Sequence, residues 1–160
     1  MWPAEFERLR TRIAGAVGDV AVAIEHVGST AVPGLAAKPV IDMVVVVEPH
    51  DLQTAVARLV AIGYVHQGNR GVEGRDAFGV PEGERRHHLY VSPTDSEELR
   101  AQLAFRDRLR ANPELAAKYE GLKRELAVQQ AEIYGRLKVE PLTFFDSTTH
   151  PLGSLDLRAP

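Results

Sequence analysis

The run at residues 40–47 places the strongest constraint on the fold of this chain. It reads VIDMVVVV and is apolar except for Asp42. Continuous β-branched residues favour a strand that is buried on both faces of a sheet. A charged carboxyl group in such a strand is costly unless it has a partner or a ligand. The run therefore predicts an interior strand that carries a paired or functional acid.

The loop that precedes this strand is rich in groups that bind phosphate. Gly28 allows a ligand to approach the backbone closely, and the N–H groups of a following turn can bind an anion. Ser29 and Thr30 add hydroxyl donors, and Lys38 adds a positive charge. On the strand, Asp42 offers a carboxylate that can hold Mg²⁺ together with substrate phosphates. These residues predict a phosphate site with Mg²⁺ as the expected metal and Mn²⁺ or Zn²⁺ as alternatives.

Hydrophobic periodicity predicts the order helix, strand, strand, helix, short strands, strand and two helices. Thr94 with Glu97 has the spacing of a capping box, Asn112 with Pro113 marks a second helix start, and Asp51 is positioned to cap the helix that follows it. The order predicts an α+β (mixed α/β) domain, with a small mixed sheet backed by helices and a C-terminal helical hairpin. The expected strands lie at residues 20–27, 40–47, 64–67, 77–80 and 87–92.

Length and charge limit the class of protein. The 160 residues favour one domain, expected at residues 1–145, with a loosely held tail at 146–160. A net charge of -3 argues against nucleic acid as an obligatory partner. The absence of cysteine excludes a thiolate metal site and a cysteine nucleophile. The first residues lack the apolar core of a signal peptide and no apolar run is long enough to cross a bilayer, so a cytoplasmic protein without a membrane partner is expected.

Three segments resemble a known family. The motif HVGSTAVPGLAAKPVID is similar to the signature of the GrpB (UPF0157) family, RRHHLYV to its His-His-Leu-His strand, and LAFRDRLRANPELAAKYEGLKRELA to its helical region. The resemblance implies the nucleotidyltransferase fold, a small mixed sheet with helices on one side. It also implies that Gly28 and Ser29 grip the triphosphate of a nucleotide and that Asp42 is the first acid of an Asp-x-Asp/Glu pair. The fusion of family members to dephospho-CoA kinase implies a link to CoA metabolism.

The sequence departs from that pattern at the second acid. Val44 stands two residues after Asp42, on the same side of the strand, whereas nucleotidyl transfer generally relies on two metals held by several carboxylates. Two hypotheses remain open. In the first, Asp42 with His88, and with Glu25 as a further ligand, forms an altered metal site, and the protein transfers a nucleotidyl group from a nucleoside triphosphate to a small acceptor. In the second, the protein binds a nucleotide or a CoA-like molecule without catalysis.

Two adjacent histidines compete for the place beside the acid. His87 and His88 point to opposite faces of their strand, so only one can line the site. Tyr90 shares the face of His88, which favours His88 as the catalytic candidate, either as a metal ligand or as a general base.

A glycine-rich, charged segment at residues 68–84 predicts a mobile flap. Arg75 on this segment is expected to close over the phosphates, since arginine binds them through two hydrogen bonds. In the C-terminal helices, Tyr119 lies on the apolar stripe and is expected in the core, and Lys123 is expected at the surface.

Overall fold

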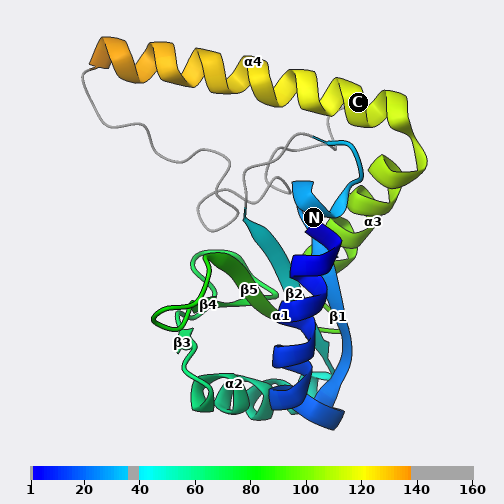
Figure 1. The fold of residues 1–160 in the computed structure, drawn as a ribbon, viewed down its shortest axis with the longest axis vertical. Helices are drawn as coiled ribbons and strands as arrows, with labels where there is room; N and C mark the ends of the chain where they lie inside the picture. Colours follow the sequence, from blue (N-terminus) through cyan, green and yellow to red (C-terminus); the bar gives the residue numbers. More distant parts are fainter. Residues whose placement is uncertain (1, 36–39, 138–160) are drawn as a thin grey trace.

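The computed structural model describes residues 2–35 and 40–137 (Figure 1). Lys38 and the tail at 146–160 lie outside the described residues. The strands are β1 (Ala21–Val27), β2 (Ile41–Val47), β3 (Val65–His66), β4 (Asp76–Gly79) and β5 (His87–Pro93). The helices are α1 (Trp2–Val17), α2 (Leu52–Ala61), α3 (Glu97–Ala111) and α4 (Pro113–Leu137), with short 3-10 turns η1 (Gly18–Val20), η2 (Ser29–Ala31) and η3 (Pro49–Asp51).

The strands form one mixed sheet in the order β1-β2-β5-β4-β3. β2 pairs antiparallel with β1 and parallel with β5, so it is an interior strand, as its apolar run predicts. The parallel register places Asp42 directly beside His88 and Val44 beside Tyr90. Residues paired in register point to the same face of a sheet, so these four side chains share one face.

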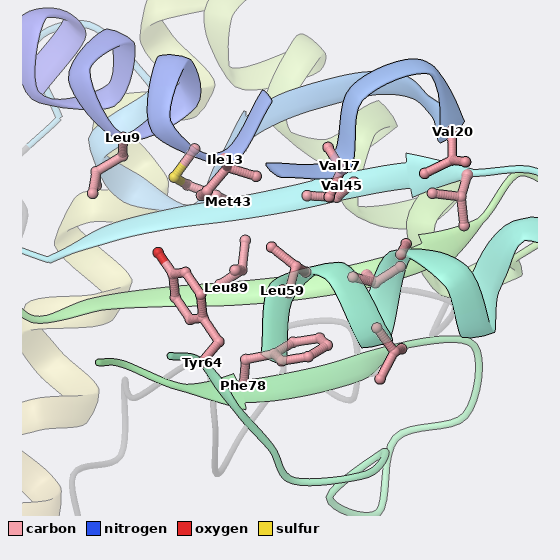
Figure 2. Packing of buried hydrophobic residues seen from close by; sticks show 14 of the residues in the cluster. Leu9, Ile13, Val17, Val20, Met43, Val45, Leu59, Tyr64, Phe78 and Leu89 are labelled. Atoms are coloured by element: carbon pink, nitrogen blue, oxygen red, sulfur yellow. The ribbon is translucent and has the colours of Figure 1, made fainter. Parts of the chain in front are cut away.

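The main core lies between the sheet and the helices α1 and α2. Leu9, Ile13 and Val17 recur at helical spacing along α1 and are almost fully buried. Figure 2 shows them packed against Met43 and Val45 of β2, the two residues that flank Val44 and point to the opposite face. The alternation along β2 therefore separates the core of α1 and α2 from the face that carries Asp42.

The second face of the sheet is covered by α3. Val44, Tyr90 and Leu99 belong to a separate buried cluster, and Leu103 of α3 packs against it. Helices thus lie on both faces, and the expectation of helices on one side is wrong. The physical reason is that both faces of β2 are apolar, so each face needs a cover.

Helix starts follow the sequence signals in part. Asn112 caps α4 through its Oδ1, which accepts a hydrogen bond from the backbone of Leu115 at 3.1 Å. The prediction for Thr94 is wrong, because Ser96 caps α3 by accepting from the Leu99 backbone at 3.2 Å. The strand β5 runs to Pro93, so the helix begins two residues later than the capping-box spacing indicates. Asp51 precedes α2 without a side-chain capping bond.

The glycine-rich segment is tied to the body of the protein. Its strand β4 pairs with β3 and β5, close to the predicted strand at 77–80. The Glu84 carboxylate forms ion pairs with Arg8 and Arg12 of α1. Arg75 is only 5% exposed, and its guanidinium lies 4.3 Å from the centre of the Tyr90 ring. Arg75 is therefore held in the sheet region rather than on an unpaired flap, and its predicted contact with phosphate stays a prediction.

In the described parts of the chain, none of the helices combines the length and the apolar character that a membrane span requires.

Candidate functional site

The acid of β2 and the histidine of β5 form a hydrogen-bonded pair. His88 Nδ1 lies 2.7 Å from Asp42 Oδ1, and both side chains are largely buried, at 11% and 13% exposure. Because a carboxylate only accepts, His88 donates its Nδ1–H. This contact fixes the tautomer that places the lone pair of the neutral ring on Nε2. The sequence prediction that brings these two residues together agrees with this geometry, and His87 lies on the other face.

His87 has a structural environment in the core of α1 and α2. Its Nε2 and the Tyr64 hydroxyl are 2.7 Å apart, and its Nδ1 lies 2.7 Å from the Arg85 carbonyl oxygen. Burial lowers the pKa of the imidazole. The two contacts give both ring nitrogens of His87 a partner within the fold.

Gly28 brings the loop into contact with the acid. Its backbone has φ 73° and ψ -172°, a conformation that is open to glycine and strained for other residues. A Cβ atom at this position would lie 2.4 Å from Asp42 Oδ2. The chain therefore needs glycine here for two independent reasons. Asp42 Oδ1 accepts the hydrogen bond from His88, and Asp42 Oδ2 lies next to Gly28, the residue before the η2 turn.

A lysine of α4 reaches the same turn. Lys123 Nζ donates to Ser29 Oγ at 2.7 Å, which joins the first residue of η2 to a helix almost a hundred residues later. Lys123 was expected at the surface, so the sequence reasoning missed it. Its spacing of four residues from Tyr119 could have indicated a shared face of the helix. The site therefore has an ammonium group, although Lys38 lies outside the described residues.

The Thr30 side chain contacts His26 of β1 rather than the charged groups near Gly28 and Ser29. Its Oγ1 lies 2.8 Å from His26 Nε2, and the pair is buried. The His26 ring stacks on Phe6 of α1, with ring centres 4.6 Å apart. Burial, followed by the positive charge of Arg110, lowers the pKa of His26 to about 4. Thr30 therefore fastens the η2 turn to α1, and its predicted contact with phosphate stays a prediction.

Two arginines of α3 hold β1 and the turn. Arg106 Nη1 donates to Glu25 Oε2 at 2.6 Å and to the His26 carbonyl oxygen at 3.0 Å. Arg110 donates to the Ala31 carbonyl oxygen at 2.7 Å. Glu25, expected as a further metal ligand, has a salt-bridge partner instead. These contacts tie α3 to β1 through Arg106 and to the end of the η2 turn through Arg110.

The position of the missing acid is part of the apolar core. Val44 is 1% exposed and packs with Val27, Val46 and Tyr90. Among residues 2–35 and 40–137 no group of three or more histidine, aspartate and glutamate side chains could hold a metal ion. The described side chains therefore do not form a protein-built site for two metals, which needs several carboxylates.

Sequence comparison identifies the origin of this arrangement. Residues 1–141 match the family described as GrpB protein. The chain belongs to the GrpB family. It is 34% identical over 132 residues to the UPF0157 protein YqkA of Bacillus subtilis, a match that covers 82% of this chain and 38% of that protein. It is also 33% identical over 159 residues to a dephospho-CoA kinase of Mycolicibacterium paratuberculosis, covering 82% of this chain and 38% of the kinase. The chain thus spans well under half the length of these two relatives.

Solved structures show the same fold. The crystal structure of GrpB from Enterococcus faecalis has a TM-score of 0.70 and 34% identity, with 81% of this chain and 80% of that chain covered. A structure of Cid1, described as having RNA terminal uridylyl transferase activity, has a TM-score of 0.51 and 13% identity, with 75% and 39% covered. This GrpB chain therefore has a nucleotidyltransferase-like fold, as the resemblance implies.

Proposed function

We propose that this GrpB chain binds a phosphorylated small molecule of the nucleoside triphosphate class where the η2 turn meets β2, β5 and α4. The observation that carries the proposal is the contact between Gly28 and the Asp42 carboxylate, beside a turn that Lys123 reaches from α4. Backbone N–H groups, the Ser29 hydroxyl and an ammonium group are donors for phosphoryl oxygens. The nucleotidyltransferase-like fold supports this choice of ligand.

The proposed cation is Mg²⁺, held by Asp42 and by the phosphates of the ligand. Mg²⁺ commonly uses one or two protein carboxylates and keeps several waters. Asp42 Oδ2 lies beside Gly28, whereas Oδ1 accepts from His88, so a cation bound at Oδ2 would leave the contact with His88 in place. The cation would neutralise phosphate charge next to the carboxylate. Mn²⁺ fits the same oxygen ligands, and Zn²⁺ is included in the test because of His88.

Nucleotidyl transfer is a second candidate, favoured by the Asp42–His88 pair. The oxygen of an acceptor hydroxyl would bond to the α-phosphorus, the bond from that phosphorus to the β-phosphate oxygen would break, and pyrophosphate would leave. His88 Nε2 would take the hydroxyl proton, and Asp42 would stabilise the resulting imidazolium through Nδ1, as a carboxylate does for a catalytic histidine. Binding of a nucleotide or a CoA precursor without transfer is the alternative, favoured by the buried Val44.

The test is the melting temperature of the protein with ATP, CTP, GTP, UTP or dephospho-CoA, each with and without MgCl₂, MnCl₂ or ZnCl₂. A ligand present at a hundred times its Kd stabilises the folded state by about 2.7 kcal/mol, which gives a shift of several degrees. We expect a nucleoside triphosphate with MgCl₂ to raise the melting temperature more than either component alone. If none of the five compounds shifts it under any condition, the proposal is wrong.

Two lysines of α4 provide a matched pair of variants. Lys123 reaches Ser29, whereas Lys118 lies exposed on the same helix. Lys123→Met removes the ammonium group at the turn, and we expect it to abolish most of the ligand-induced shift. Lys118→Met makes the same change in net charge and leaves the shift in place. Equal shifts in the two variants would place the ligand elsewhere.

A further inference from the structure

Tyr119 of α4 has a buried hydroxyl group without a hydrogen-bond partner among residues 2–35 and 40–137. Within the described residues its oxygen has no partner, although the ring is well packed. The ring meets Phe105 edge-on at 5.1 Å between ring centres. It also packs against the cluster of Val32 and Leu35, which follow the η2 turn. Tyr119 thus covers the loop that carries the proposed phosphate site.

A hydroxyl group in such a place needs an explanation. Buried tyrosine hydroxyls usually find a hydrogen-bond partner, because an unsatisfied buried donor retains the full cost of its desolvation. A phenylalanine would make the same ring contacts without that cost. The hydroxyl therefore contributes nothing favourable to the unliganded fold that its ring does not already supply.

Charged groups of the proposed phosphate site lie near the Tyr119 side chain. Lys123 follows one turn later, and its Nζ lies 5.6 Å from the centre of the Tyr119 ring and 2.7 Å from Ser29 Oγ. Burial, followed by the negative charge of Asp42, raises the pKa of the Tyr119 hydroxyl. The group therefore stays protonated and acts as a donor at any physiological pH.

We propose that Tyr119 donates its O–H to an anionic oxygen of the phosphorylated ligand and so, with Lys123, makes α4 the second wall of the binding site. The inference rests on the proposed function and adds to it a named donor from a helix far away in sequence. In the unliganded protein this donor is already desolvated and held by its ring contacts, so binding does not have to order it.

Tyr119→Phe tests the inference, because it removes only the hydroxyl oxygen. Binding is measured by calorimetry with two probes, magnesium tripolyphosphate and magnesium ATP, and the melting temperature is measured without ligand. We expect the melting temperature to stay the same or to rise, because an unsatisfied donor is removed. We expect Kd for both probes to increase about tenfold, the size of effect that follows from losing one hydrogen bond to a charged group.

Tyr64→Phe is the matched control on the other face of the sheet. The Tyr64 hydroxyl and His87 Nε2 are 2.7 Å apart in the main core. Here the same change breaks a buried hydrogen bond, so we expect a lower melting temperature and an unchanged Kd. Tyr119→Phe should therefore weaken binding without lowering the melting temperature, whereas Tyr64→Phe should lower the melting temperature without weakening binding.

The outcomes separate this inference from the proposed function. If the wild-type protein binds the probes and Tyr119→Phe binds them equally tightly, the inference is wrong and the proposed function stands. A fall in the melting temperature of Tyr119→Phe without a change in Kd would assign the hydroxyl a purely structural role and also overturn it. If the wild-type protein binds neither probe, the proposed function fails for triphosphates and the inference fails with it.

Discussion

The carboxylate of Asp42 lies against the backbone of Gly28, so close that a Cβ atom at position 28 would be 2.4 Å from Asp42 Oδ2. The loop and the acid of β2 therefore form one unit rather than two neighbouring features. The unit depends on a residue without a side chain at its centre.

Gly28→Ala should damage this unit, whereas the same substitution at Gly34 should not. Gly28 combines a positive φ with the contact to Asp42, whereas Gly34 has a φ of +78° and open space around it. Backbone strain at such positions costs about 1–3 kcal/mol. We expect Gly34→Ala to lose about that much unfolding free energy, and Gly28→Ala to lose more because the Asp42 carboxylate must move. Urea unfolding at neutral pH measures both.

Ligand binding provides the second comparison for these glycines. Gly28→Ala should also lose the nucleotide-induced shift in melting temperature, because its methyl group displaces Asp42 from His88. Gly34→Ala should retain the shift. Equal loss of stability and equal binding in the two variants would contradict the close contact.

The sequence predicts the parts of this site that lie within one short stretch of chain. Gly28, Ser29 and Asp42 fall within fifteen residues, and the apolar run of β2 makes an interior strand the expected solution. The pairing of Asp42 with His88 needs in addition the parallel register of β2 and β5. That register is set by packing across the whole sheet, so local patterns alone leave it open.

The contributions of α3 and α4 could not be predicted in the same way. The periodicity of these helices identifies their apolar and polar faces. It does not identify which elements of the fold pack against those faces, so the contacts of Arg106, Tyr119 and Lys123 could not be predicted. The direction in which α4 leaves Asn112 decides that Lys123 reaches Ser29. For Arg75 the composition of its segment indicated a flap, whereas pairing of β4 with β5 places its guanidinium over Tyr90.

Val44→Asp would restore the second acid of the pattern and should unfold the site rather than repair it. Val44 is 1% exposed and belongs to the cluster with Val27 and Tyr90. A carboxyl group buried without a partner costs several kcal/mol or must remain protonated. We expect a loss of more than about 3 kcal/mol of unfolding free energy, a size typical of an unpaired buried polar group.

Val22→Asp is the control for this substitution, because Val22 of β1 is 58% exposed. It should change the unfolding free energy by less than about 1 kcal/mol, as most surface substitutions do. A Val44→Asp protein that is as stable as Val22→Asp would show that position 44 can accommodate a second metal ligand.

The buried His26 predicts how stability depends on pH. Its pKa in the folded protein is about 4, below the ordinary value of 6.5, and the pKa of His87 is also lowered. Between pH 6.5 and pH 5 the unfolded chain binds more protons than the folded one, so stability falls as pH falls. One such proton changes the unfolding free energy by up to about 1.4 kcal/mol per pH unit. Urea unfolding at pH 7.5, 6.5, 5.5 and 5.0 measures the slope.

The control for this slope is His50→Asn, because the His50 side chain is 79% exposed. Its pH dependence should match that of the wild-type protein. Stability that stays constant from pH 6.5 to pH 5 would contradict the buried, neutral state of His26. Direct titration of the histidine resonances by NMR would then show which of the two buried rings is already charged.

His88→Asn separates binding from catalysis at the Asp42 pair. The Nδ2 of asparagine can take the place of His88 Nδ1, which lies 2.7 Å from Asp42 Oδ1, whereas the variant has no group in the place of Nε2. Asp42 therefore keeps a donor, and we expect the nucleotide-induced shift in melting temperature to remain. If the chain transfers a nucleotidyl group with His88 as general base, product formation should fall by about 10²–10⁴-fold, the usual contribution of such a base. Mass spectrometry of reaction mixtures with a nucleoside triphosphate measures the product.

His66→Asn is the matched control, because His66 also pairs with an aspartate, Asp76 Oδ1, at 2.9 Å but lies on β3 at the far edge of the sheet. Turnover in this variant should equal that of the wild-type protein. If His88→Asn turns over as fast as His66→Asn, His88 is not the base, and the Asp42–His88 contact serves only to hold the carboxylate. If the wild-type protein binds a nucleotide with MgCl₂ and forms no product, the site binds without catalysis. The buried Val44, in the place of the second acid, would then explain the loss of transfer.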